Sequence, residues 1–117
     1  MSKTLTPLDA ATILLNACQE IGEQIYFDED IFVQTLRGSD THPVRFFNLK
    51  RLRCFETFAD VKAKPLLDAI AWLIKEEFIY RADEGAQTLL LLAPNALERI
   101  KTADLMDFAK LLQLDKE

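Results

Sequence analysis

The chain has 117 residues, half of them hydrophobic and only three of them glycine, so it is long enough to bury one core and is neither disordered nor collagen-like. Its formal net charge of −5 argues against indiscriminate coating of nucleic acid, although it leaves room for a local binding face. No secretory segment stands at the start, and no apolar run approaches the roughly 20 residues that span a membrane. We therefore expect one cytoplasmic domain over residues 1–117.

The beginning of the chain predicts a helix and then a short strand. Apolar residues recur at spacings of three and four over residues 10–21, which indicates one buried helix face. Pro7 suits the first turn of this helix, and Gly22 suits its end. Residues 24–27 are rich in β-branched and aromatic side chains, which is typical of a strand.

A second helix is predicted between two punctuating residues. Asp28 or Asp30 can cap its first turn, where the helix dipole favours acidic side chains. Gly38 suits its C-terminal end because glycine readily adopts a left-handed conformation. A turn-rich segment then covers residues 39–43.

A short basic helix is predicted over residues 49–55, with Asn48 as its cap. At helical spacing, its apolar side would hold Leu49, Leu52 and Phe55. Its other side would hold Lys50, Arg51 and Arg53. Such an amphipathic helix places its apolar seam on the core and its charges in water.

The second half of the chain predicts a helix, a hairpin and a terminal helix. Pro65 suits the first turn of a helix whose buried stripe comprises Leu66, Leu67, Ile70, Leu73 and Ile74. Residues 78–82 and 87–92 are predicted to pair around a tight, glycine-containing and acidic turn at residues 83–86. Pro94 and the residue after it begin a terminal helical region.

Three helices followed by a hairpin form the winged-helix layout, a helix-turn-helix variant with a β wing. The predicted fold class is thus α+β and mostly α, a winged helix with a short hairpin wing and an extra C-terminal helix. Its core would cover about residues 8–100, and the C-terminal extension about residues 101–117.

The positive charge is concentrated in one stretch, residues 37–64. Seven Lys and Arg residues lie there against three acidic residues, which gives a local charge of +4, whereas the segments before and after it carry −5 and −4. Clustered Lys and Arg side chains neutralise phosphates and release counterions, which supplies most non-specific affinity for nucleic acid. The alternative is that these charged side chains form an ordinary solvated surface with no binding role.

Several motifs in this stretch resemble the RQC winged-helix domain of RecQ-type DNA helicases. They are Leu36-Arg37-Gly38-Ser39, Val44-Arg45, and Arg51-Leu52-Arg53 with Phe55, at the spacing that this family has. The resemblance spans about residues 8–100. It departs from the family in lacking the helicase motor motifs and the preceding zinc-binding cysteines, and in having Glu56 and Phe58 where the family has glycine.

The resemblance implies a stand-alone RQC-like module that docks on double-stranded DNA, forked or junction DNA included, mainly through phosphate contacts. A helicase or repair protein is a further partner that it implies. The predicted DNA-binding residues are Arg37, Ser39, Arg45, Lys50, Arg51, Arg53, Lys62 and Lys64. Backbone amides near Gly38 and Ser39, together with the Ser39 hydroxyl, are expected to add contacts to phosphate.

Several side chains have two interpretations. Arg37 is as suited to capping carbonyls or pairing with Asp40 as to contacting phosphate. Phe46 and Phe47 can stack on bases, but at least one of them is expected in the core. His42 is expected to be an exposed loop residue that contacts phosphate or a base edge.

Two further regions bear on partners. Trp72 points away from the buried stripe of its helix, so it is either covered by the terminal helix, which we favour, or exposed as a partner surface. Tyr80, Arg81, Gln87 and Thr88 at the base of the wing could touch a DNA backbone. The acidic tip repels phosphate, however, so little wing contact is expected.

No catalytic site, metal site or cofactor is predicted, and we expect no enzyme. The acidic run at residues 28–30 is explained by capping, and a lone His42 cannot build a metal site. Cys18 and Cys54 suggest neither a disulfide nor a zinc cluster. The basic neighbours of Cys54 could lower the pKa of its thiol, although no base is placed to use it.

The alternative from another class is a protein-interaction module that forms a homodimer through Trp72 and the terminal helix. An acidic total charge and a bare wing fit that interpretation. A small transcriptional regulator is a third interpretation, and it requires a dimer whose recognition helices are about one DNA turn apart.

Overall fold

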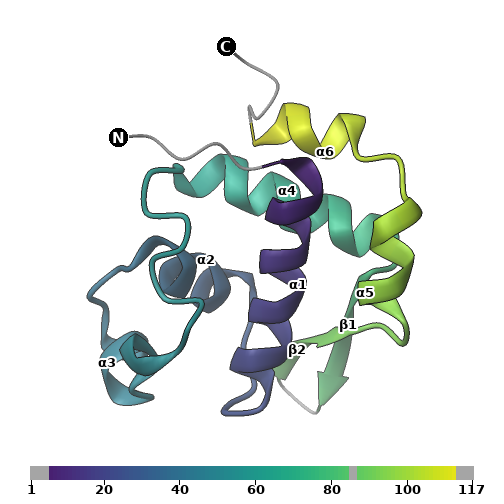
Figure 1. The fold of residues 1–117 in the computed structure, drawn as a ribbon. Coiled ribbons are helices and arrows are strands. Elements are labelled where there is room, and N and C mark those ends of the chain that lie inside the picture. Colours follow the sequence, from purple (N-terminus) through teal and green to yellow (C-terminus); the bar gives the residue numbers. More distant parts are fainter. Residues whose placement is uncertain (1–5, 85–86, 113–117) are drawn as a thin grey trace.

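The computed structural model describes residues 6–84 and 87–112, in which helices enclose a core with a hairpin at its edge (Figure 1). The elements are α1 Pro7–Gly22, α2 Glu29–Arg37, α3 His42–Phe46, a 3₁₀ turn Leu49–Arg51, α4 Ala63–Lys75, β1 Ile79–Glu84, β2 Gln87–Leu92, α5 Ala96–Arg99, a 3₁₀ turn Ile100–Thr102 and α6 Met106–Leu111. The fold class is α+β and mostly helical, as predicted. In these described ranges, no helix is long and apolar enough to cross a membrane.

The core lies between α1, α2, α4 and the hairpin. Figure 1 shows α1 running through the middle of the molecule, with α2 and α3 on one side and the hairpin and α5 on the other. α1 contacts β2, α2 packs on α4, and α6 covers α4. Large, fully buried side chains come from all of these elements and include Leu14, Phe32, Ile70, Ile79 and Phe108.

The ends of the first two helices are fixed by the predicted signals. The Thr6 hydroxyl accepts a hydrogen bond from the Asp9 amide (3.0 Å), and Pro7 follows as the first helical residue. The Asp28 carboxylate accepts one from the Ile31 amide (3.0 Å), so Asp28 rather than Asp30 is the cap of α2. Both helices therefore begin where the sequence predicts.

Gly38 ends α2 and also permits a close approach. Its φ of +74° is left-handed, and a Cβ atom at this position would lie 2.6 Å from the Cβ of Glu56. Beside it, the Glu56 amide donates to the Thr35 carbonyl (2.9 Å) and the Phe58 amide to the Leu36 carbonyl (2.8 Å). The segment that follows α3 is thus laid across the C-terminal end of α2.

The strand predicted at residues 24–27 is wrong. The amides of Gln24 and Ile25 both donate to the Ile21 carbonyl, at 2.9 and 3.0 Å, which turns the chain at the end of α1. Only Phe27 reaches the hairpin, where its carbonyl accepts a hydrogen bond from the Leu90 amide (3.1 Å). One such bond is too few for a strand ladder.

The helix predicted at residues 49–55 is also wrong. The third α-helix is α3, which begins inside the segment predicted as turns, and residues 49–51 form only one 3₁₀ turn. Asn48 adopts a left-handed conformation without capping through its side chain. The amides of Arg53 and Cys54 donate to the carboxylate of Glu20 on α1 (3.0 and 3.1 Å), which replaces the bonds that a longer helix would need.

The inside-outside pattern predicted for that segment nevertheless holds for most of its residues. Leu49 and Leu52 are buried and Phe55 is partly buried, whereas the three basic residues are exposed. Alternating burial of this kind is satisfied by a 3₁₀ turn and an extended residue as well as by a helix. Burial was therefore predictable where the local structure was not.

The predicted hairpin is confirmed. β1 and β2 pair antiparallel from Ile79 opposite Leu92 to Glu84 opposite Gln87. The turn predicted at residues 83–86 is wrong in part, because Asp83 and Glu84 belong to β1 and lie opposite Thr88 and Gln87. Residues 85–86 lie outside the described residues. The hairpin is held to the helical part by the Phe27–Leu90 bond and by α1.

The C-terminal region is interrupted rather than one helix. α5 continues into a 3₁₀ turn, and Ala103 after it is extended. At the start of α6, the Asp104 carboxylate accepts a hydrogen bond from the Met106 amide (3.0 Å). α6 brings Phe108 onto Trp72, with ring centroids 5.4 Å apart. The favoured interpretation of Trp72, coverage by the terminal helical region, is confirmed.

Candidate nucleic-acid interface

The candidate interface is centred on the α3 corner, by which we mean residues 40–51. It lies on the side of the molecule away from α5 and α6 (Figure 1). The corner brings together three of the predicted basic residues, Arg45, Lys50 and Arg51, all of them exposed. Arg45 lies on α3, and the other two lie on the 3₁₀ turn that follows. Val44 and Leu49 are buried and anchor the corner to the core.

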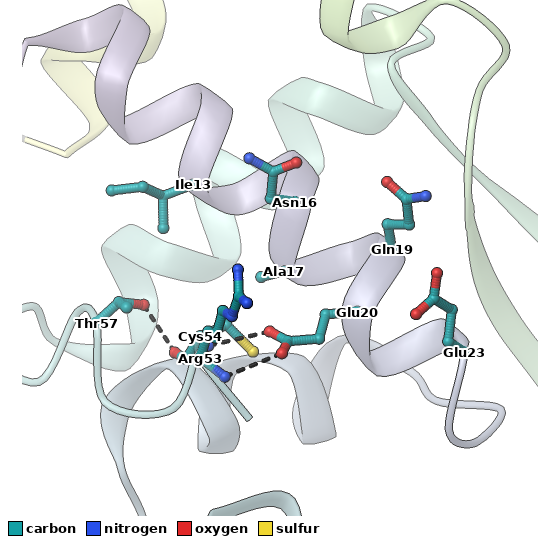
Figure 2. A pocket seen from close by; sticks show the side chains of 9 residues that line it. All are labelled: Ile13, Asn16, Ala17, Gln19, Glu20, Glu23, Arg53, Cys54 and Thr57. Atoms are coloured by element: carbon teal, nitrogen blue, oxygen red, sulfur yellow. Dashed lines mark hydrogen bonds between the residues drawn. The ribbon is translucent and has the colours of Figure 1, made fainter. Parts of the chain in front are cut away.

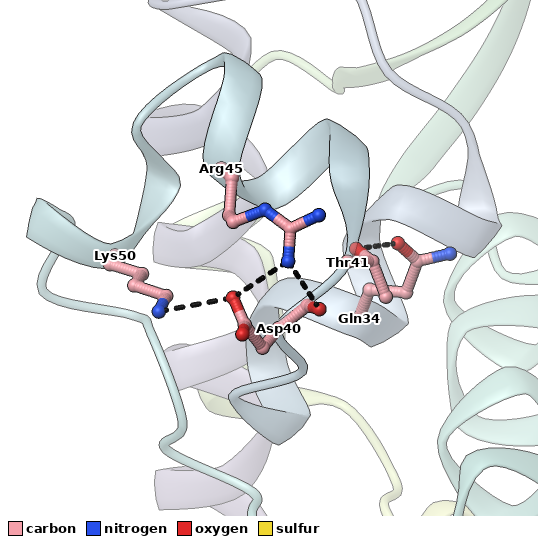
Figure 3. A network of polar contacts seen from close by, with 5 residues as sticks. All are labelled: Gln34, Asp40, Thr41, Arg45 and Lys50. Atoms are coloured by element: carbon pink, nitrogen blue, oxygen red, sulfur yellow. Dashed lines mark hydrogen bonds and ion pairs between the residues drawn. The ribbon is translucent and has the colours of Figure 1, made fainter.

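Two of these cations converge on one carboxylate. Arg45 Nη1 lies 3.4 Å and Lys50 Nζ 3.1 Å from the same oxygen, Oδ1 of Asp40, and Arg45 also donates to the Asp40 carbonyl (3.3 Å) (Figure 3). The hydrogen bond and charge of Lys50, with a smaller contribution from Arg45, hold the pKa of Asp40 below its ordinary value. All three side chains are more than half exposed, so water screens the pairs and leaves them weak.

The loop that carries Asp40 is fixed to α2. The Thr41 hydroxyl donates to Gln34 Oε1 (2.6 Å), as Figure 3 shows, and the Ser39 amide donates to the Gln34 carbonyl (2.9 Å). Asp40 is therefore held between the two cations by a constrained backbone. The arrangement can bind an anionic oxygen at the place where the carboxylate now lies.

Arg51 and Arg53 point toward the end of α1. Arg51 donates to Gln24 Oε1, and the Arg53 side chain lies in an open hollow of about 630 Å³ beside α1 (Figure 2). The hollow is lined by Ile13, Asn16, Ala17, Gln19, Glu20, Glu23, Arg53, Cys54 and Thr57. It carries two carboxylates against one guanidinium, so it repels phosphate except near Arg53 itself.

Arg37 and Ser39 have structural partners. Arg37 Nε donates to the Val61 carbonyl (2.8 Å), which is the carbonyl-binding role that the sequence left open beside phosphate contact. The amides of Gly38 and Ser39 donate to the Thr35 and Gln34 carbonyls. The expectation that these amides would be available to a phosphate is therefore wrong.

Lys62 and Lys64 lie apart from the corner, at the start of α4. Lys62 is the residue before the helix, and both lysines are exposed. Lys64 Nζ lies 3.2 Å from the Asp68 carboxylate one turn further along α4. The predicted basic residues thus form two groups, joined by the segment that crosses the end of α2.

The aromatic side chains of the corner are exposed. Phe46 is 70 % and Phe47 37 % exposed, so the expectation that at least one of them lies in the core is wrong. α3 has only five residues and buries Val44, which leaves Phe46 on the other side. The Phe46 ring stacks on His42 (5.6 Å, 19°) and meets Phe47 edge-on (4.9 Å, 89°). His42 is exposed, as predicted, but begins α3 rather than lying in a loop.

The wing is tied to the rest of the chain. Arg81 forms an ion pair with Glu29 at the start of α2, with 2.8 Å from Nε to the carboxylate. Tyr80 is exposed. The side chains of Gln87 and Thr88 lie outside the described residues. The pairing of Arg81 supports the ordinary structural interpretation of the wing base.

Cys18 and Cys54 are both buried and unpaired by a disulfide. Burial and the adjacent Glu20 carboxylate raise the pKa of Cys54 to about 12, so the expected lowering by basic neighbours is wrong. Burial likewise raises the pKa of Cys18 to about 12. Among the described residues, no three His, Cys, Asp or Glu side chains gather where they could hold a metal ion.

Sequence reasoning missed the partners of the cations. Glu20 on the last turn of α1 accepts the amides of Arg53 and Cys54, and Gln24, just beyond the end of α1, accepts from the Arg51 side chain. They lie 27–34 residues away in the chain, so no local pattern could have indicated them. Asp40 was considered as a partner for Arg37, whereas its partners are Arg45 and Lys50.

No model of a known protein family matches the sequence, and a comparison with curated proteins gives no match either.

Proposed function

We propose that this chain is a DNA-binding module of the winged-helix type that docks on duplex or junction DNA mainly through phosphate contacts. The observation that carries the proposal is the convergence of Arg45 and Lys50 on one exposed anionic oxygen, that of Asp40. A phosphodiester of DNA offers the same kind of anionic oxygen and the same single negative charge. Both cations lie within reach of a ligand because they are more than half exposed.

The arrangement of elements supports a winged-helix interpretation. The three long helices α1, α2 and α4 precede a two-stranded hairpin, and Phe27 joins that hairpin from the position of a first, vestigial strand. The order agrees with the RQC-like motifs of residues 36–55. α4, not the segment at residues 49–55, takes the place of the helix before the wing.

Within this module, we assign the main phosphate contacts to Arg45, Lys50, Arg51 and Arg53. Lys62 and Lys64 supply a second group of charge at the start of α4. Arg37 and Ser39 act mainly through the backbone that they support. No catalytic step is part of the proposal, and a helicase or repair protein remains a candidate partner.

Salt-dependent binding of a fluorescent blunt duplex tests the proposal. Replacing Arg45 and Lys50 together with alanine, or Arg51 and Arg53 together, should weaken binding for every sequence. Each loss of two phosphate contacts should reduce the slope of log K against log salt by about 2. The matched control is Lys101→Ala with Lys110→Ala, which removes the same charge from the C-terminal region. Affinities that fall equally in the control, or in none of the variants, would overturn the assignment.

The alternative is homodimerisation through Trp72 and the terminal helix. In the described structure, Trp72 packs against Phe78 and Phe108 of its own chain, with centroids at 6.0 and 5.4 Å. The side chain that suggested a partner surface is therefore already used internally. A dimeric mass in solution, combined with no binding to DNA, would favour the alternative.

A further inference from the structure

We propose that His42 and Phe46 form a stacking platform for an unpaired base beside the Arg45–Lys50 pair, so that the module prefers DNA with a single-stranded end or gap over a blunt duplex. This inference rests on the proposed DNA-binding function and names its substrate more narrowly. It assigns a role to aromatic residues that phosphate binding alone does not use.

The platform is an ordered group of rings. His42 and Phe46 lie four residues apart on α3, with centroids 5.6 Å apart and planes within 19° of parallel. Phe47 meets Phe46 edge-on at 4.9 Å, which restricts the Phe46 ring. The first two rings already contact each other, so a base would stack on an outer face and not between them.

The exposure of the platform distinguishes it from a core cluster. Phe46 is 70 % exposed, and the other exposed ring at its side, Phe47, extends the apolar area. Exposed aromatic faces of this kind are the groups on which bases stack in proteins that bind single strands. The rings belong to the same five-residue helix as Arg45 and stand close in sequence to Lys50.

The charges next to the rings favour nucleic acid as the occupant. Single-stranded DNA is held by aromatic side chains that stack on bases and by cations that follow the phosphates. Both parts occur here within residues 42–50. A duplex buries its base faces inside the stack, whereas an unpaired base has free faces that can stack on the rings. An apolar protein partner would gain nothing from Arg45 and Lys50.

The experiment compares one blunt duplex with the same duplex carrying a short single-stranded tail, using fluorescence anisotropy at fixed salt. The tail is made with normal bases or with abasic nucleotides, which keep the phosphates and remove the rings that stack. Wild-type protein should bind the normal tail about tenfold more tightly than the abasic tail. Because this arm uses unaltered protein, it does not depend on whether a variant folds.

Phe46→Ala supplies the second arm. It should remove the preference for normal over abasic tails while leaving binding to the blunt duplex unchanged, and Phe46→Trp should restore the preference. Equal affinity of wild-type protein for both tails would overturn the platform, as would equal losses on blunt and tailed DNA in Phe46→Ala. A protein that binds none of the probes would overturn the proposed function itself, which is a different outcome.

Discussion

The molecule has two clusters in which aromatic rings lie beside cations, and they are used in opposite ways. At the C-terminal end, Trp72, Phe78 and Phe108 pack together, and the guanidinium of Arg99 lies 4.7 Å from the centre of the Phe78 ring. Arg99 also donates to the Glu77 carbonyl (3.0 Å) at the end of α4. The cluster is closed and holds α4, α5 and α6 together.

The second cluster, at the α3 corner, has the same chemical ingredients but no cover. His42, Phe46 and Phe47 contact one another at the surface, and Arg45 and Lys50 face an exposed carboxylate. The closed cluster shows that this chain can satisfy aromatic and cationic groups internally. The open cluster is the surface to which the proposed function assigns the ligand.

The largest expected difference between the two clusters is in how much each contributes to stability. If Phe108→Ala and Phe46→Ala destabilised the fold equally, this distinction would be wrong. Phe108→Ala should destabilise the fold by about 3–5 kcal/mol, because it empties a fully buried site and uncovers Trp72. Phe46→Ala should change the free energy of unfolding by less than about 0.5 kcal/mol, because the ring is mostly in water. Urea unfolding followed by the fluorescence of Trp72, the sole tryptophan, measures both.

A pair of arginine variants tests the same distinction between the two clusters, with a smaller expected loss of stability. Arg99→Ala should cost about 1 kcal/mol, since it removes a cation–π contact and a helix-end hydrogen bond. Arg45→Ala should cost less than about 0.5 kcal/mol, since its ion pair is exposed. Thermal unfolding at one protein concentration compares them, and an Arg45 effect as large as that of Arg99 would contradict the distinction.

Asp40→Asn tests whether the corner is open to anions. The substitution removes the charge that competes for Arg45 and Lys50 and keeps the shape of the side chain. We expect duplex DNA to bind several-fold more tightly, with a change of up to about 1 kcal/mol. Asp107→Asn on α6, which removes the same charge far from the corner, is the control. Weaker binding by Asp40→Asn would show that Asp40 supports the ligand instead of competing with it.

The smallest expected effect is on the pH dependence of stability. The folded-state pKa of Asp40 is lower than its ordinary value of 3.8, so the carboxylate stabilises the fold fully above that value. The contribution is lost as the pH falls below it, through the folded-state pKa. Wild-type protein should therefore lose slightly more stability than Asp40→Asn between about pH 4 and pH 2. Parallel acid-unfolding curves for the two proteins would contradict this.

The parts of the fold that depend on nearby residues were predictable from the sequence. The spacing of apolar residues gave α1, α2 and α4, and Asp28 and Gly38 gave the ends of α2. Two mainly apolar segments on either side of a glycine-containing turn indicated the hairpin. In each case the interactions lie within a few residues of one another.

The parts that failed depend on contacts across the chain. The helix expected at residues 49–55 is replaced because Glu20, 33 residues earlier, accepts the amides of Arg53 and Cys54. Burial next to the same Glu20 reverses the expected shift in the pKa of Cys54. Phe46 is exposed because α3 is short and buries only Val44. This helix was not predicted, because residues 39–43 were expected to form turns. The exposure of Lys50, Arg51 and Arg53 was predictable from the sequence, but the way in which the basic side chains group in space was not.

The tether between Asp40 and its two cations has a consequence for selectivity by ligand size. Because the carboxylate belongs to the same short loop, its effective concentration at Arg45 and Lys50 is at least on the order of millimolar and never dilutes. A free nucleotide or inorganic phosphate brings only one binding group with which to displace the Asp40 carboxylate. A polymer presents many phosphates in succession and rebinds before it diffuses away. Under the proposed function, we therefore expect the Asp40 carboxylate to disfavour monomeric anions more strongly than DNA.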